Sequence, residues 1–102
     1  MASKTPVAVA RAVSKIGADL ATWRKLRRLT AAEVADRAGL STSTLLRLER
    51  GDGASLENVL RVARALGVLE LMADAVDPFD TDVGRLRAAE SLPARVRRRR
   101  SP

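Results

Sequence analysis

The chain has 102 residues, and its 19 Lys and Arg against 12 Asp and Glu give a formal net charge of +7 and a pI of about 11.4. It contains no Cys and no His, which excludes thiol chemistry, disulfides and the common zinc sites. Hydrophobic residues make up 46% of the chain and aromatic residues only 2%. This composition predicts one small helical domain with a core of Leu, Val, Ile and Ala, and its charge makes nucleic acid the default partner.

The first fifteen residues are predicted to be an N-terminal extension. Residues 1–6 are polar, and the pattern at 7–15 is compatible both with an extended helix and with partial order. Residues 16–28 then predict a helix, because Ile16, Leu20 and Trp23 recur at helical spacing and give it one apolar stripe. We expect Trp23 to anchor the core rather than to stack on a nucleic-acid base.

Residues 30–51 predict two short helices joined by a tight turn. Thr30 and Glu33 form a Ser/Thr-x-x-Glu capping box ahead of a helix at 31–38. Gly39 stands where the chain must leave this helix with a positive φ. Ser41 can cap a second helix at 42–50, whose Leu45 and Leu48 would face the core. This is the layout of a DNA-binding helix-turn-helix, in which the second helix enters the major groove.

The remaining sequence predicts two further helices and a charged tail. Ser55 can cap a helix that ends before Gly67 and turns Leu56, Val59, Leu60, Ala63 and Leu66 inward. A helix at about 68–76 follows, and we expect Asp77-Pro78 to end it. Residues 79–92 predict a short helix around 83–89. We therefore expect a DNA-binding domain at 16–76 and a C-terminal extension with a basic tail at 77–102.

The tail from Pro93 onward is too charged to fold alone. Its RRRR run at 97–100 has three open interpretations: an unspecific phosphate-binding arm, a partner-binding tail, or a tail that keeps the protein in solution.

Residues 16–67 resemble the phage-repressor-like (Cro/XRE) helix-turn-helix family. The resemblance is carried by IGADL at 16–20, WRKLRRLTAAEVADRAGLS at 23–41, TLLRLERG at 44–51 and SLENVLRVARALG at 55–67. It implies an all-α fold, a compact five-helix domain like that of lambda repressor. It also implies an ion pair between Arg24, late in the first helix, and Glu49, near the end of the third, which we expect to be structural.

The same resemblance implies base contacts by Thr42, Ser43 and Arg47, which lie on the face of their helix away from Leu45 and Leu48. Arg47 is the sharpest candidate because a guanidinium can bind O6 and N7 of guanine with two parallel bonds. The alternative for Arg47 is an ordinary solvated side chain.

Phosphate contacts are expected from the helix N-termini and from Ser41, Arg50, Arg27 and Arg28. The alternative for Arg27 and Arg28, with Lys25, is a solvated basic face. One residue departs from the family pattern: Ala31 stands where many members carry a phosphate-clamping Gln, and it can offer only its backbone amide.

Residues 77–97, DPFDTDVGRLRAAESLPARVR, resemble the C-terminal segment of HipB-like antitoxins, which usually accompany a HipA-like kinase toxin. That resemblance implies a protein that binds operator DNA as a dimer, represses its own operon and holds the kinase inactive. Independently, the apolar residues of the fifth helix exceed what a small core needs, which makes them candidates for a homodimer interface: Leu69, Leu71, Met72, Val76 and also Phe79.

The leading hypothesis is therefore a dimeric repressor that reads double-stranded operator DNA and acts as an antitoxin. The alternatives are a stand-alone regulator of the same family without a toxin partner and an interaction module without base preference. An enzyme is not expected, because the chain lacks His, Cys and a glycine-rich phosphate loop. No cofactor, metal or membrane partner is expected, and the lack of a signal peptide or an apolar run of roughly 18 residues leads us to expect a cytoplasmic location.

Overall fold

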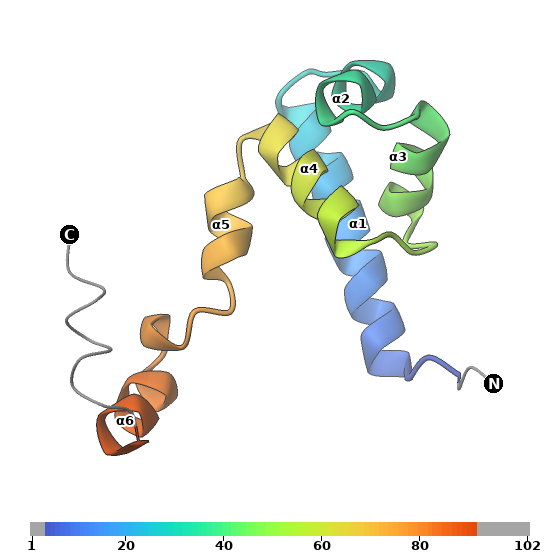
Figure 1. Ribbon diagram of the computed structural model, residues 1–102. Coiled ribbons are helices and arrows are strands. Elements are labelled where there is room, and N and C mark those ends of the chain that lie inside the picture. The colour runs from blue at the N-terminus through green and yellow to red at the C-terminus, as the bar shows by residue number, and fades with distance from the viewer. Residues whose placement is uncertain (1–3, 92–102) are drawn as a thin grey trace. The chain divides into compact units, whose positions relative to one another are not determined.

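A computed structural model describes residues 4–91, and every regular element in that range is helical (Figure 1). The elements are α1 (Val7–Leu26), α2 (Ala31–Ala38), α3 (Thr42–Arg50), α4 (Leu56–Leu66), α5 (Leu69–Asp74), the short 3₁₀ helix η1 (Pro78–Asp80) and α6 (Asp82–Ser91). The predicted all-α, lambda-repressor-like fold class is confirmed. The basic run at 97–100 lies outside the described residues.

The chain divides after Glu70 into two compact units. In the first, α1 packs against α3 and α4, while α2 packs against α3 and α4. The buried side chains of this unit are almost entirely Leu, Val and Ala: Leu20, Val34, Ala35, Ala38, Leu45, Leu48, Val62, Ala63, Leu66 and Val68. Small aliphatic side chains thus let four short helices approach closely without aromatic residues at their centre.

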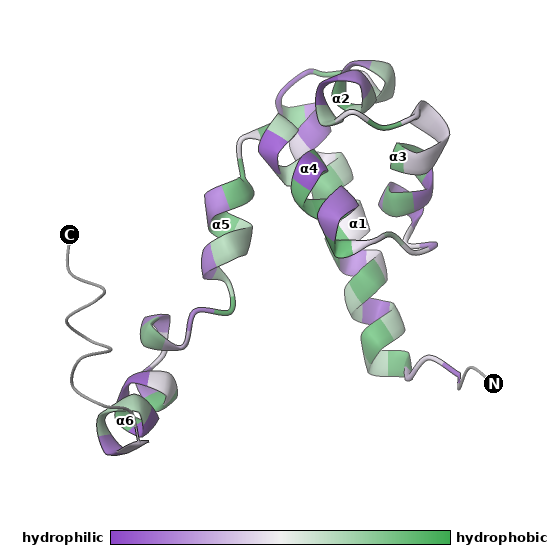
Figure 2. Ribbon diagram, in the orientation of Figure 1, coloured by the Kyte–Doolittle hydropathy of each residue, from purple (hydrophilic) through white to green (hydrophobic). Residues whose placement is uncertain are grey.

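The predicted bounds of α2 and α3 agree with the structure, whereas those of α1 differ. Residues 7–15, whose order the sequence left open, are helical and belong to one continuous α1 that begins at Val7. The first turns of α1 extend beyond the bundle formed by α2, α3 and α4 (Figure 1), and apolar residues continue into them (Figure 2). Val7 and Val9 are accordingly exposed.

Two predicted core positions lie elsewhere. Ile16 is 43% exposed, whereas the neighbouring Gly17 is buried against α3. Leu56, predicted to point inward, is 72% exposed, and Val62 is fully buried instead. Leu56 lies only about 20° around the helix from Ala63, but it is the first residue of α4 and lies about two turns before Val62, Ala63 and Leu66, which form the buried face.

The second unit contains η1 and α6, which pack against each other. The hydroxyl of Thr81 accepts a hydrogen bond from the amide of Gly84 at 2.9 Å and so caps the start of α6. Gly84 lies directly against the carbonyl of Pro78, where a side chain would not fit. In this unit Ala88 is the buried hydrophobic residue among those described, so α6 leaves most of its surface exposed.

Candidate nucleic-acid interface

The helix-turn-helix is built from local signals at both ends of α2. The hydroxyl of Thr30 accepts from the amide of Glu33 at 3.1 Å, and the Glu33 carboxylate accepts from the amide of Thr30 at 2.8 Å. This capping box lowers the pKa of Glu33, chiefly through the hydrogen bond from the Thr30 amide. At the other end, Gly39 adopts φ 73° and turns the chain towards α3, a conformation that strains other residues.

Helix α3 has one face against the core and one face in solvent. Leu45 and Leu48 are buried, and Ser41 caps the helix by accepting from the amide of Thr44 at 3.1 Å. Thr42, Ser43 and Arg47 are exposed. Within residues 4–91 the Arg47 side chain makes no hydrogen bond or ion pair. Its guanidinium is thus available to a ligand at no cost in lost internal contacts.

Arg24 and Glu49 tie α1 to α3. Nε of Arg24 donates to Oε2 of Glu49 at 2.8 Å and Nη2 donates to Oε1 at 3.0 Å, a bidentate pair. The side chains are only 15% and 8% exposed, and Arg24 also donates to the Leu29 carbonyl at 3.2 Å. The hydrogen bond to Glu49 raises the pKa of Arg24. This pair holds the C-terminal half of α3 in a fixed orientation on the bundle.

Gly17 is a positioning residue that the sequence analysis missed. A Cβ atom at Gly17 would lie 2.9 Å from the Glu49 carbonyl oxygen and closer still to that of Leu48, so only glycine lets α1 approach the last turn of α3. The available signal was a glycine inside an otherwise regular helical pattern, which often marks a close contact.

The expected phosphate-binding residues have different surroundings. Arg50 is exposed and pairs with Asp52 at 3.0 Å. The Ser41 hydroxyl is occupied by the α3 cap and lies 2.7 Å from Oγ1 of Thr44. Both residues border α3 and can approach a backbone that runs past it.

The two arginines after α1 differ from each other. The Arg27 guanidinium lies 5.5 Å from the centre of the Trp23 ring and next to Gly67, on the side of α1 that faces the end of α4. This cation–π contact uses the face of the guanidinium, so the in-plane N–H groups of the exposed Arg27 side chain can still donate to a phosphate. Arg28 is exposed and adopts φ 58°, a left-handed conformation that is uncommon for any residue but glycine. Trp23 itself is half-buried, so its burial does not distinguish a core anchor from a residue that stacks on a nucleic-acid base.

Comparison with known protein families gives a match over the helix-turn-helix. A family model described as helix-turn-helix (HTH_3) matches residues 20–71, just over half of the chain. The chain belongs to this helix-turn-helix family. Its members are DNA-binding transcription regulators, and α2 and α3 lie within the matched residues with the layout of a helix-turn-helix. The searches of curated proteins and of solved structures gave no match.

The helix-turn-helix match ends at Leu71 and so includes the start of α5. Of the residues considered for a dimer interface, Leu71 is 64% and Val76 is 87% exposed, while Leu69, Met72 and Phe79 are half-buried. No helix within residues 4–91 is both long and apolar enough to cross a membrane, and acidic side chains in that range form no cluster suited to a metal ion.

Proposed function

We propose that the chain is a sequence-specific repressor that binds operator DNA as a homodimer. The observation that carries this proposal is the solvent-facing side of α3, where Thr42, Ser43 and Arg47 stand beside one another without a role in the core. A helix that reads bases needs such a face, because any side chain used for packing is lost to the groove.

Arg47 is the proposed base reader with the greatest selectivity, and Thr42 and Ser43 are proposed to contact base edges or a thymine methyl. Arg50 and Arg28 are proposed to bind phosphates, together with the amides at the start of α2 and α4. Arg27 is proposed to join them through the in-plane N–H groups that its contact with Trp23 does not use. Ala31 at the start of α2 offers an amide but no side chain that can bind a phosphate. The position of the domain on the DNA backbone therefore depends more on the arginines.

Dimerisation is proposed because one small domain offers few base contacts, and two copies double them over half-sites about one helical turn apart. The apolar residues of α5 and the residues after it support this step, because none of them is part of the buried core: Leu71 and Val76 are exposed, and Leu69 and Met72 are half-buried.

The test is a titration of the full-length protein with a duplex from upstream of its gene and with an unrelated duplex, at two salt concentrations. We expect the upstream duplex to bind about a thousandfold more tightly. Arg47→Ala should relax the preference at one base position per half-site. Arg50→Ala should weaken binding to all sequences and reduce the salt slope by about 1.

Arg37→Ala is the matched control for these variants. Arg37 is an exposed arginine on α2 that lines a hollow between α2 and α4 rather than the free face of α3. The control should leave the base preference unchanged. Equal and steeply salt-dependent binding to both duplexes would refute base reading and favour an interaction module that binds DNA by charge alone.

We further propose that the protein is an antitoxin for a HipA-like kinase. The support is the resemblance of residues 77–97 to HipB-like antitoxins. In that segment η1 and α6 form a unit with an exposed surface that includes Val83 and Leu86. A kinase gene beside this one, and co-purification of its product with the full-length chain but not with a Leu86→Glu variant, is the expected result. Operator binding without such a gene or partner would favour the stand-alone regulator.

A further inference from the structure

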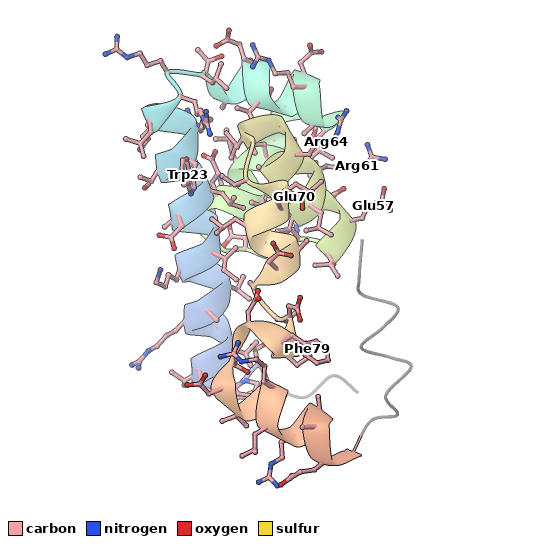
Figure 3. All side chains as sticks on the ribbon, turned by 90° about the vertical axis from the view of Figure 1, so that its left-hand side faces the viewer. Trp23, Glu57, Arg61, Arg64, Glu70 and Phe79 are labelled. Carbon is pink, nitrogen blue, oxygen red and sulfur yellow. The ribbon has the colours of Figure 1, made fainter. Side chains whose placement is uncertain are left out.

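An apolar groove of about 590 Å³ lies along α4. Leu56, Leu60 and Leu69 give it an apolar surface, and the charged residues that line it are Glu57, Arg61 and Arg64. Figure 3 shows these three charged residues following one another along one side of α4. The core side of α4 is a different one, formed by Val62, Ala63 and Leu66. Leu56 is 72% exposed, so this groove presents leucine side chains to solvent.

The two arginines of the groove differ in their hydrogen bonding. Nε of Arg61 donates to Glu57 at 2.9 Å and its Nη1 donates to the Ala38 carbonyl at 3.4 Å, which fixes the side chain between α4 and the end of α2. The Arg64 side chain is exposed and forms no hydrogen bond or ion pair with any described residue. A second hollow of about 240 Å³ continues from here and adds Arg37 and Asp36. The groove therefore combines an apolar surface with an unused positive charge.

The chain itself contains a segment of complementary chemistry. Residues 65–84 include five acidic residues and no Lys or Arg, although the whole chain is strongly basic. Within this segment Leu71 is 64% exposed, and Asp74, three residues later on α5, is exposed without a side-chain partner among residues 4–91. An exposed leucine beside an unpaired carboxylate is what a leucine-lined groove with an unpaired guanidinium can accept.

We propose that the α4 groove receives helix α5 of a second copy of this chain, with Arg64 of one copy paired to Asp74 of the other. The proposal rests on the homodimer proposed above and extends its interface from α5 to Leu56, Leu60 and Arg64. Leu69 belongs both to the groove and to the α5 residues of the proposed interface. In a two-fold dimer each contact occurs twice, so one Arg64–Asp74 combination gives two ion pairs.

A charge-swap experiment tests the pairing. Arg64→Asp and Asp74→Arg, each alone, should raise the dimer dissociation constant at least about tenfold, because each places two like charges opposite one another. The double variant Arg64→Asp/Asp74→Arg should return to within about threefold of the wild-type value. Both residues are exposed, and circular dichroism should show unchanged helix content. Analytical ultracentrifugation of the full-length chain measures the dimer in each case.

A second variant tests the leucines. Leu56→Glu should give monomers, whereas Val7→Glu, a similar change at a residue 66% exposed at the start of α1, should not. A wild-type dimer that is unaffected by both Leu56→Glu and the charge swaps would overturn the α4 groove while leaving dimeric operator binding intact. A wild-type monomer on and off DNA would overturn the proposed dimer as well. Loss of kinase binding by Leu56→Glu with an unchanged dimer would assign the groove to another partner and overturn this proposal.

Discussion

Gly17→Ala isolates the contact between α1 and α3. An added methyl group would meet the Glu49 carbonyl oxygen at 2.9 Å and the Leu48 carbonyl more closely, whereas an ordinary contact begins near 3.4 Å. The α3 backbone must therefore move by at least about 0.5 Å or α1 must bend. Overpacking of this kind costs about 1–3 kcal/mol. We expect a cost near about 3 kcal/mol here, because the atoms in contact belong to the backbone and cannot rotate away.

The same substitution also improves the helix. Ala exceeds Gly in helix propensity by about 1 kcal/mol, so the net loss of unfolding free energy should be about 2 kcal/mol. For a domain of this size that corresponds to a melting temperature lower by about 8–16 °C. Because the last turn of α3 shifts with the contact, operator affinity should fall even at temperatures where the protein is fully folded.

Urea denaturation followed by circular dichroism gives the free energy, and the exchange Ala18→Gly supplies the control. Ala18 is exposed on the next position of α1, so its replacement reports helix propensity alone and should cost about 1 kcal/mol. The change in helix propensity is stabilising in Gly17→Ala and destabilising in Ala18→Gly. A Gly17→Ala protein as stable as the wild type, or more stable, would show that α1 and α3 do not pack as described.

Three further predictions concern the elements around α3. Arg24→Ala should cost about 3–5 kcal/mol in denaturant unfolding because it leaves the Glu49 carboxylate buried without its partner, and Arg24→Met/Glu49→Met should recover most of this; equal losses would mean the charge is not the cause. Arg28→Gly should raise the unfolding free energy by about 0.5–1 kcal/mol by relieving the left-handed backbone, yet lower DNA affinity; a gain in both would remove Arg28 from the phosphate contacts. Because the pKa of Glu33 is lowered in the folded state, its contribution to stability is complete above the usual glutamate pKa and is lost as the pH falls through the folded-state pKa. The unfolding free energies of the wild type and of Glu33→Ala should therefore become equal at acidic pH. A difference that stays constant with pH would exclude the Glu33 carboxylate as its origin.

The sequence predicted α2 and α3 well because their ends carry local signals. Thr30 and Ser41 cap them, and Gly39 and Gly51 end them with positive φ, so neither boundary depends on distant contacts. The start of α1 has no such signal. No side chain caps it at Pro6, and its helical state could not be decided from residues 7–15.

Burial was harder to predict because it depends on which helix covers which face. The apolar residues of helix α4 form one broad arc that includes both residues, so periodicity alone did not distinguish the core residue Val62 from the groove residue Leu56. For the site, the exposure of Arg47 followed from the two leucines opposite it. The contact of Arg27 with Trp23 depends on the chain's path after α1, which no spacing rule supplies.

The separation of α3 into a packed face and a free face has a consequence for how such a protein can evolve. Substitutions at exposed positions such as Thr42, Ser43 and Arg47 are expected to change stability by no more than about 0.5 kcal/mol, since these side chains take no part in the core. Mutations there therefore leave the small free energy of unfolding of the domain almost unchanged. With the proposed base-reading role of this face, a duplicated copy of the gene can therefore acquire a new operator by a few changes there, while Gly17 and the Arg24–Glu49 pair continue to hold that helix in place.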